Sequence, residues 1–346
     1  MLEADREPGA RLLEAAAQAA PMGPVRVVAV NAQQRSVLET CREAEVRGLA
    51  EPLLIGERAA IVDIAAEIGW KVDPSRVIAA EDEAGAAAKA VSLVRSGRAD
   101  VVMKGYLHTN TFMRALLDSE RGLRVPGGRV SHVFVSDVPS YPKLLHITDA
   151  AINIAPDLNA KAQIVQNAVD FAALLGVEPA KVAALSAVET VNPAIASTLD
   201  AACLTLMAQR GQIGGAVVDG PLGFDNAISA TAAREKGIDS AVAGDADILL
   251  VPDLISGNVL AKNLEYLAGA MVAGLVLGLS APVVLSSRAD PAPARLAALA
   301  IAALMHHRGA APARTPGVTE AEASVHCAAQ PEAACCPLPP VTSTAA

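Results

Sequence analysis

Short aliphatic runs alternate with segments of helical periodicity along most of the chain. The run Val25–Val30 (VRVVAV) predicts the first strand, and comparable runs follow at intervals. Short apolar runs separated by helices are typical of βαβ units, so the pattern favours an α/β fold with a mainly parallel sheet. The later predicted strands span residues 52–55, 100–103, 132–135, 143–148, 151–154, 182–185, 216–218, 248–251 and 283–285.

The helical pattern is clearest at residues 159–175. Ile164, Ala168 and Phe171 recur at helical spacing, and Gly176 follows as a C-terminal stop. The segment therefore predicts one helix, which begins just after a plausible entry into a second domain at Pro156.

The segment 267–285 has no charged residue over nineteen positions. Gly269, Gly274 and Gly278 interrupt it, and Pro282 precedes its last three residues. These breaks favour a buried helix, a turn and a buried strand over a helix that spans a membrane.

Composition limits the kind of partner. Hydrophobic residues make up 52% of the 346 residues and aromatic residues only 2%, so aliphatic side chains must build the core. The formal net charge is −9, and no basic run could neutralise a row of phosphates. Nucleic-acid binding as the main role is therefore disfavoured.

The first twenty-one residues and the cysteines indicate the compartment. Acidic residues stand where a secretory signal carries basic ones, which argues against a signal peptide. Leu2, Leu12, Leu13 and Ala16 could form one face, so this stretch predicts an amphipathic helix. Cys41 and Cys203 are predicted to be inert core thiols, and no CxxC pair or HExxH motif indicates zinc. A reducing cytoplasmic setting fits this pattern.

The composition changes after Arg308. Six prolines lie among Ala, Ser, Thr and Glu, and no apolar periodicity continues, so residues 309–346 are predicted to be a disordered tail. Removing residues 310–346 is expected to leave folding and activity intact. A large fall in melting temperature on truncation would contradict this.

Common phosphate-binding and hydrolase fingerprints are absent from the sequence. There is no GxxxxGK[ST] motif, no GxGxxG after the first strand, and no GxSxG. Ligands of open α/β sheets bind beyond the carboxyl ends of strands. Four polar segments that follow predicted strands are therefore the candidates for a site.

Two of these segments offer positive charge. In residues 103–117, Lys104 and Arg114 flank a helix start at which Thr109 or Asn110 is expected to cap; this is either an anion site or an ordinary capped helix. In residues 283–290, a buried strand delivers Arg288, which needs an anionic partner in the protein or in a ligand.

The other two segments offer acids and amides. In residues 219–229, Asp219 and Asp225 flank a turn, where they either serve a site or brace the loop. In residues 243–262, Asn258 and Lys262 are four residues apart and share one helical face, which is either functional or a solvated surface.

In order and spacing, these segments resemble the phosphate acetyltransferase / phosphate butyryltransferase family, and the butyryltransferase-like branch in particular. The resemblance covers residues 100–305. It rests on the strings MKG…HTNTFMRALL…GLR, VAALSAVE, DGPLGFDNAIS, KGIDSAVAGDAD, VPDLISGN and LSSRAD.

The resemblance implies an activity and an architecture. The activity is reversible transfer of an acetyl or butyryl group between coenzyme A and inorganic phosphate, with acyl phosphate as product and no tightly bound cofactor or metal. The architecture is a two-domain α/β/α fold similar to isocitrate and isopropylmalate dehydrogenases, with a cleft between domains, in a homodimer or larger homo-oligomer. The first domain would hold residues 1–155 and 287–308, and the second would hold residues 156–286.

The resemblance also implies roles for individual residues. Ser287 and Arg288 match the family's catalytic Ser–Arg pair, with Arg288 binding phosphate and stabilising charge on the acyl carbonyl. Thr109 and Arg114 match a substrate-binding threonine and arginine. The remaining expected substrate-binding residues are Lys104, Asp219, Asp225, Asn226, Asn258 and Lys262.

The sequence departs from the family at two positions. Ala294 stands where acetyltransferases carry an acid that is a candidate base for the thiol proton, and Asp290 is the nearby acid that would replace it. Ala261 replaces a tyrosine, which would widen or empty part of the pocket.

Two other functions are retained as alternatives. A catalytically degenerate protein that only binds coenzyme A or acyl phosphate would explain both alanines. A metal- and NAD-dependent decarboxylating dehydrogenase on the same fold would use Asp245, Asp247 and Asp253, although these acids straddle a strand rather than converge from a helix.

Overall fold

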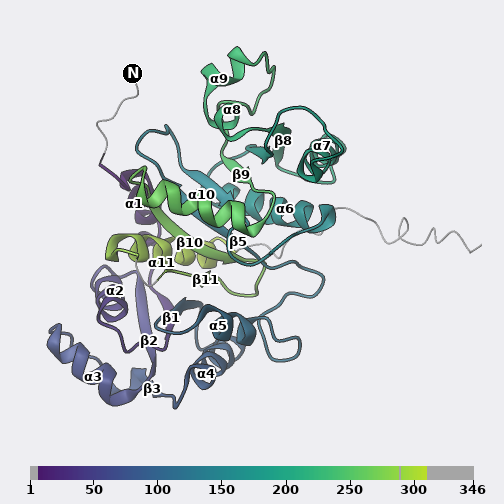
Figure 1. Ribbon diagram of the computed structural model, residues 1–346. Coiled ribbons are helices and arrows are strands. Elements are labelled where there is room, and N and C mark those ends of the chain that lie inside the picture. Colours follow the sequence, from purple (N-terminus) through teal and green to yellow (C-terminus); the bar gives the residue numbers. More distant parts are fainter. Residues whose placement is uncertain (1–6, 288–289, 310–346) are drawn as a thin grey trace, which may run out of the picture. The chain divides into compact units, whose positions relative to one another are not determined.

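The computed structural model describes residues 7–287 and 290–309, which form a mixed α/β fold around one eleven-stranded sheet (Figure 1). The strand order is β3-β2-β1-β4-β11-β10-β5-β6-β9-β7-β8. The strands are β1 (Val25–Val30), β2 (Ala50–Gly56), β3 (Val77–Ala79), β4 (Val101–Lys104), β5 (Ser131–Asp137), β6 (Leu145–Thr148), β7 (Ala180–Leu185), β8 (Ala216–Leu222), β9 (Ile248–Leu250), β10 (Met271–Leu277) and β11 (Val283–Val284).

The predicted α/β class and mainly parallel sheet are confirmed. The antiparallel pairings are those of β10 with β11, β10 with β5, and β5 with β6. As a result β4 and β11 run in one direction, whereas β9 and β8 run in the other. The loops after β4 and β11 therefore lie at one edge of the sheet, and the loops after β8 and β9 lie at the opposite edge.

The predicted strand at residues 151–154 is wrong. The carboxylate of Asp149 accepts hydrogen bonds from the main-chain amides of Ala151, Ile152 and Asn153 at 2.9, 3.0 and 3.3 Å. These amides are turned onto one side chain instead of a neighbouring strand, so the apolar run forms a bend.

The predicted helix at the start of segment 267–285 is also wrong, because residues 271–277 form strand β10. This strand is covered on both faces, which removes the alternation that marks a half-exposed strand. Gly274 lies beneath the end of β11: a Cβ at this position would stand 2.6 Å from the carbonyl oxygen of Leu285. The glycine is a mark of close backbone approach in a sheet rather than a helix break.

Helices cover both faces of the sheet. Alternate residues of the central strands pack on α4 and α5 in one cluster and on α1, α2 and α11 in another. Helix α10 lies across β5 and β6 on the same face as α4 and α5 (Figure 1). The helices are α1 (Ala10–Ala17), α2 (Arg35–Val46), α3 (Arg58–Glu67), α4 (Glu83–Arg95), α5 (Thr109–Leu116), α6 (Leu158–Leu174), α7 (Ala196–Gln209), α8 (Phe224–Ile228), α9 (Ala230–Glu235), α10 (Leu254–Tyr266) and α11 (Ala292–His307).

The helix predicted at residues 159–175 is confirmed as α6. Gly176, just beyond its end, has a φ of 84°, the left-handed conformation expected of a helix stop. The capping expected from Thr109 or Asn110 is wrong. His108 is the N-cap residue of α5, and its main-chain amide is bound by the Glu83 carboxylate of α4 at 3.0 Å.

The two predicted core thiols differ. Cys41 is fully buried, and burial raises the pKa of its thiol to about 12, as expected of an inert core cysteine. Cys203 is exposed on α7, so its predicted burial is wrong. Within the described residues, no helix has the length and apolar character needed to cross a bilayer. The predicted tail at residues 309–346 lies, apart from Gly309, outside the described residues.

Candidate functional site

The loop after β11 carries the predicted catalytic residues. The main-chain amide of Ser287 donates to Oδ2 of Asp290 at 2.7 Å, and the amide of Asp290 donates back to the carbonyl oxygen of Ser287 at 3.3 Å. Ser287 is exposed, whereas Asp290 is half-buried. Arg288, the predicted phosphate ligand, lies outside the described residues. Two hydrogen bonds between Ser287 and Asp290 therefore close the turn after β11.

An arginine that the sequence did not predict as a site residue binds the main chain at both ends of this turn. Arg295, in the first turn of α11, donates from Nη2 to the carbonyl oxygen of Ser287 and from Nε to that of Asp290, both at 3.1 Å. Only 3% of Arg295 is exposed. Its one sequence signal is a charged residue inside the otherwise apolar run of α11.

The last turns of α10 face the same loop. Burial raises the pKa of Asp290, and the charge of Glu265 raises it further, while the charges of Lys262 and Arg295 lower it. Lys262 forms an ion pair with Glu265 at 2.6 Å. The structure thus brings Asp290 and Lys262 together, although they are far apart in sequence, and adds Glu265, which no sequence pattern indicated.

The start of α10 lies at the other edge of the sheet. Asp253 caps this helix by accepting from the amide of Ser256 at 2.8 Å, and Nδ2 of Asn258 reaches the carbonyl oxygen of Ala150 at 3.4 Å. Ala261 is 2% exposed and packs in the core beneath the helix. Ala261 is thus a core residue of α10.

The predicted anion site around α5 shares an edge with the catalytic loop. Lys104 ends β4, which pairs directly with β11, and it is 5% exposed. Thr109 and Arg114 are exposed on α5. The two strand ends therefore bring a buried lysine and the Ser287–Asp290 turn to the same edge of the sheet.

The predicted residues Asp219, in β8, and Asp225 and Asn226, just after it, lie apart from the catalytic loop. Asp219 accepts from the amide of Gly220 at 2.8 Å, and Asp225 forms an ion pair with Lys236 at 3.0 Å that lowers the pKa of Asp225. Asn226 is fully buried, and neither atom of its amide group has a hydrogen-bond partner in the described part of the chain. No hydrogen bond or ion pair among the described residues joins these three to Asp290 or Lys262.

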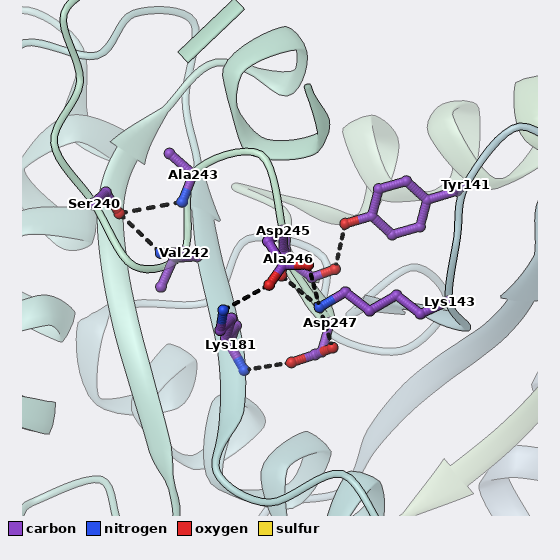
Figure 2. Close-up of polar contacts among 9 residues, drawn as sticks. All are labelled: Tyr141, Lys143, Lys181, Ser240, Val242, Ala243, Asp245, Ala246 and Asp247. Carbon is purple, nitrogen blue, oxygen red and sulfur yellow. Dashed lines mark hydrogen bonds and ion pairs between the residues drawn. The ribbon is translucent and has the colours of Figure 1, made fainter. Parts of the chain in front are cut away.

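Asp245 and Asp247, considered for a metal site, belong to a lysine-paired network instead (Figure 2). Lys143 lies 2.9 Å from Asp245 and 2.7 Å from Asp247, and Lys181 lies 2.6 Å from Asp245. Burial opposes ionisation of Asp245, but bonds from Lys181 and Lys143 outweigh it and lower the pKa of this carboxyl. Lys143 precedes β6, Lys181 lies at the start of β7, and Asp245 and Asp247 precede β9, whereas Asp253 follows β9. The network joins the starts of three strands by ion pairs. Asp245 and Asp247 are thus paired with lysines, which disfavours the metal-dependent dehydrogenase alternative.

Replacing Asp247 with alanine is expected to lower the free energy of unfolding by about 2 kcal/mol, because the amide of Lys181 loses its side-chain acceptor and Lys143 loses the more buried of its two carboxylate partners. The free energy is measured by urea denaturation. Asp245→Ala is the matched control, with a side chain 51% exposed, and should cost below about 1 kcal/mol. Activity should be unchanged in both variants. Equal losses of stability would contradict a special role for Asp247.

A family model and two named relatives match most of the chain. The model of the family described as phosphate acetyl/butaryl transferase matches residues 78–303. The chain is 51% identical over 294 residues to a phosphate acetyltransferase of Rhizobium meliloti, covering 85% of this chain and 92% of that protein. It is 45% identical over 280 residues to a phosphate butyryltransferase of Clostridium acetobutylicum, covering 81% and 93%.

A solved structure is similar to this chain in both fold and sequence. The crystal structure of a branched-chain phosphotransacylase from Enterococcus faecalis V583 superposes with a TM-score of 0.71 at 34% sequence identity. The match covers 82% of this chain and 99% of that chain. The similarity in fold and sequence thus extends over nearly the whole of that protein.

Proposed function

The chain belongs to the phosphate acetyl/butaryl transferase family, and from this premise we propose that it reversibly transfers a short acyl group between coenzyme A and inorganic phosphate. The observation that carries the proposal is the turn after β11. A half-buried carboxyl group of raised pKa, that of Asp290, is bound there to the main-chain amide of Ser287, the serine that matches the family's catalytic pair. A carboxyl group whose pKa is raised by burial is a stronger base than an exposed one and is suited to accept a proton from a substrate.

The proposed reaction is a direct displacement in a ternary complex. The coenzyme A thiol gives its proton to Asp290, and its sulfur attacks the carbonyl carbon of the acyl phosphate. A C–S bond forms, the C–O bond to phosphate breaks, and phosphate leaves with the bonding electron pair. Arg288 holds the phosphate and offsets the negative charge that develops on the carbonyl oxygen. In the reverse direction a phosphate oxygen attacks the thioester.

The assignment of the base follows from the position of Ala294. This residue is 2% exposed within α11 and carries no titratable group. Asp290 is the acid nearest to Arg288 in sequence, and its pKa is raised by burial. Ser287 would donate a hydrogen bond to the thiolate or to phosphate. No cysteine nucleophile is needed, which agrees with the inert environment of Cys41.

The remaining roles concern binding. Lys104, Thr109 and Arg114 would bind phosphate groups of coenzyme A or of the acyl phosphate, since positive charge and helix N-termini attract such anions. Lys262 would bind near Asp290, where its charge already acts. Asp219, Asp225 and Asn258 would line the cleft between the two proposed domains, residues 1–155 with 287–308 and residues 156–286, and Asn226, which is fully buried, would stand behind them. The protein would work in the cytoplasm as a homodimer or larger homo-oligomer.

The experiment that tests this function is release of free coenzyme A thiol from acetyl-CoA and butyryl-CoA, with and without phosphate. Phosphate-dependent release is expected, and the ratio of the two rates gives the acyl preference. Folded protein that binds coenzyme A but releases no thiol from either thioester would instead support the binding-only alternative.

A further inference from the structure

We propose that Arg295 is a positioning residue that holds Ser287 and Asp290, the two described ends of the turn after β11 (the catalytic turn), against helix α11 and adds positive charge beside Asp290. The proposal rests on the function proposed above, because it takes this turn to be the reacting site. It concerns a residue outside the motif strings that carry the resemblance.

The contacts of Arg295 span the turn from end to end. Its guanidinium reaches the carbonyl oxygens of Ser287 and Asp290, the described residues on either side of the Arg288–Ala289 pair, at 3.1 Å each. The turn is closed independently by the bond from the Ser287 amide to the Asp290 carboxylate at 2.7 Å. The planar fork of an arginine can hold two carbonyl oxygens at a fixed separation, which a lysine ammonium cannot do with the same geometry.

The surroundings of Arg295 make this contact rigid. The residue is 3% exposed and stands in the first turn of α11, next to Ala294 and Leu296, which are both buried. The helix continues through an apolar core that includes Leu299 and Ile301. The guanidinium is therefore carried by a buried helix of the core and joins that helix to Ser287 and Asp290.

Arg295 also acts on Asp290 through its charge. Its positive charge lowers the pKa of Asp290 against the effect of burial, and Lys262 acts in the same direction while Glu265 opposes both. These three residues are the charged groups that face the carboxyl from α10 and α11. A role in positioning and a role in tuning the base therefore predict two separate kinetic effects.

The test compares Arg295→Gln and Arg295→Lys with a matched pair, Arg58→Gln and Arg58→Lys. Arg58 also donates to two main-chain carbonyl oxygens, those of Pro74 and Val77, but it begins α3, far along the chain from the catalytic turn. Each variant is assayed for phosphate-dependent release of coenzyme A from the better of acetyl-CoA and butyryl-CoA. Melting temperature and the pH dependence of kcat/KM are measured alongside.

The expected result is a fall in kcat of about 100-fold for Arg295→Gln, because a small misplacement of reacting groups costs about that much. KM for phosphate and coenzyme A should change little. The acid limb of kcat/KM should move to higher pH in Arg295→Gln, because the charge that lowers the pKa of Asp290 is lost. Arg295→Lys should keep the limb in place and recover part of kcat. The Arg58 variants should lose stability without either kinetic change.

Each other outcome has a definite meaning. If the wild-type protein releases no coenzyme A, the proposed function fails. If the wild-type protein is active and the Arg295 variants match the Arg58 variants in kcat and pH profile, the positioning role is wrong. Unfolding of both Arg295 variants at the assay temperature would reduce its role to stability and overturn the proposal as well.

Discussion

Replacing Arg288 with alanine is expected to lower turnover about 100-fold or more, with little change in the amount of folded protein. In the proposed mechanism the substitution removes the charged donor that binds the phosphate and stabilises the negative charge that grows on the carbonyl oxygen in the transition state. The measurement is kcat in the thiol-release assay. Thermal unfolding of the same preparation establishes that the variant is folded.

The control for this prediction is Arg98→Ala. Arg98 is exposed and precedes β4, so it stands at the sheet edge opposite the catalytic turn. Its loss should leave turnover unchanged. If Arg288→Ala retained activity close to that of wild type, the assignment of Arg288 would be wrong.

The second large effect is expected for Asp290→Asn. The amide keeps the shape of the carboxyl group and can still accept from the Ser287 amide, but it cannot take the thiol proton. Turnover should fall about 100-fold, which is typical for loss of a general base. The comparison variant is Asp253→Asn, in which another carboxylate that accepts from a main-chain amide is replaced, at the N-cap of α10. It should cost some stability and little activity.

The pH dependence of kcat/KM is a second test of Asp290 as the base. Burial raises the pKa of Asp290, so the proton is retained to a higher pH than in an exposed aspartate. Because only the ionised form can accept the thiol proton, kcat/KM should fall as the pH drops through this raised pKa. Asp290→Asn should lack that limb. An unchanged limb in the variant would show that another group is the base.

Helices and strands that have a local sequence pattern could be predicted from the sequence alone. The strand at Val25–Val30 and the helix of residues 159–175 were predicted to within a residue, because apolar period and a glycine stop determine them. Strand β10 was not predicted, because a strand covered on both faces has the same uniformly apolar pattern as a buried helix. The strand predicted at 151–154 did not form, because the carboxylate of Asp149, just before it in the chain, accepts the hydrogen bonds of its amides.

The site was only partly predictable, for a topological reason. Ser287 and Asp290 follow a buried strand, so their place at a sheet edge could be inferred. The approach of Lys262 to Asp290 could not, because it depends on α10 running across the sheet from the end of β9. Arg295 gave only a weak signal, since a lone charge in an apolar helix does not reveal which carbonyl groups it meets.

The most direct test of the account is to identify the product formed from acyl-CoA. Purified protein is incubated with acetyl-CoA or butyryl-CoA and phosphate, and the phosphorus NMR spectrum is followed while free thiol is measured. The account predicts one acyl phosphate for each coenzyme A released, with none formed by Arg288→Ala on the same timescale. Release of coenzyme A with free carboxylic acid as the only acyl product would contradict it, because the acyl group would then have passed to water and not to phosphate.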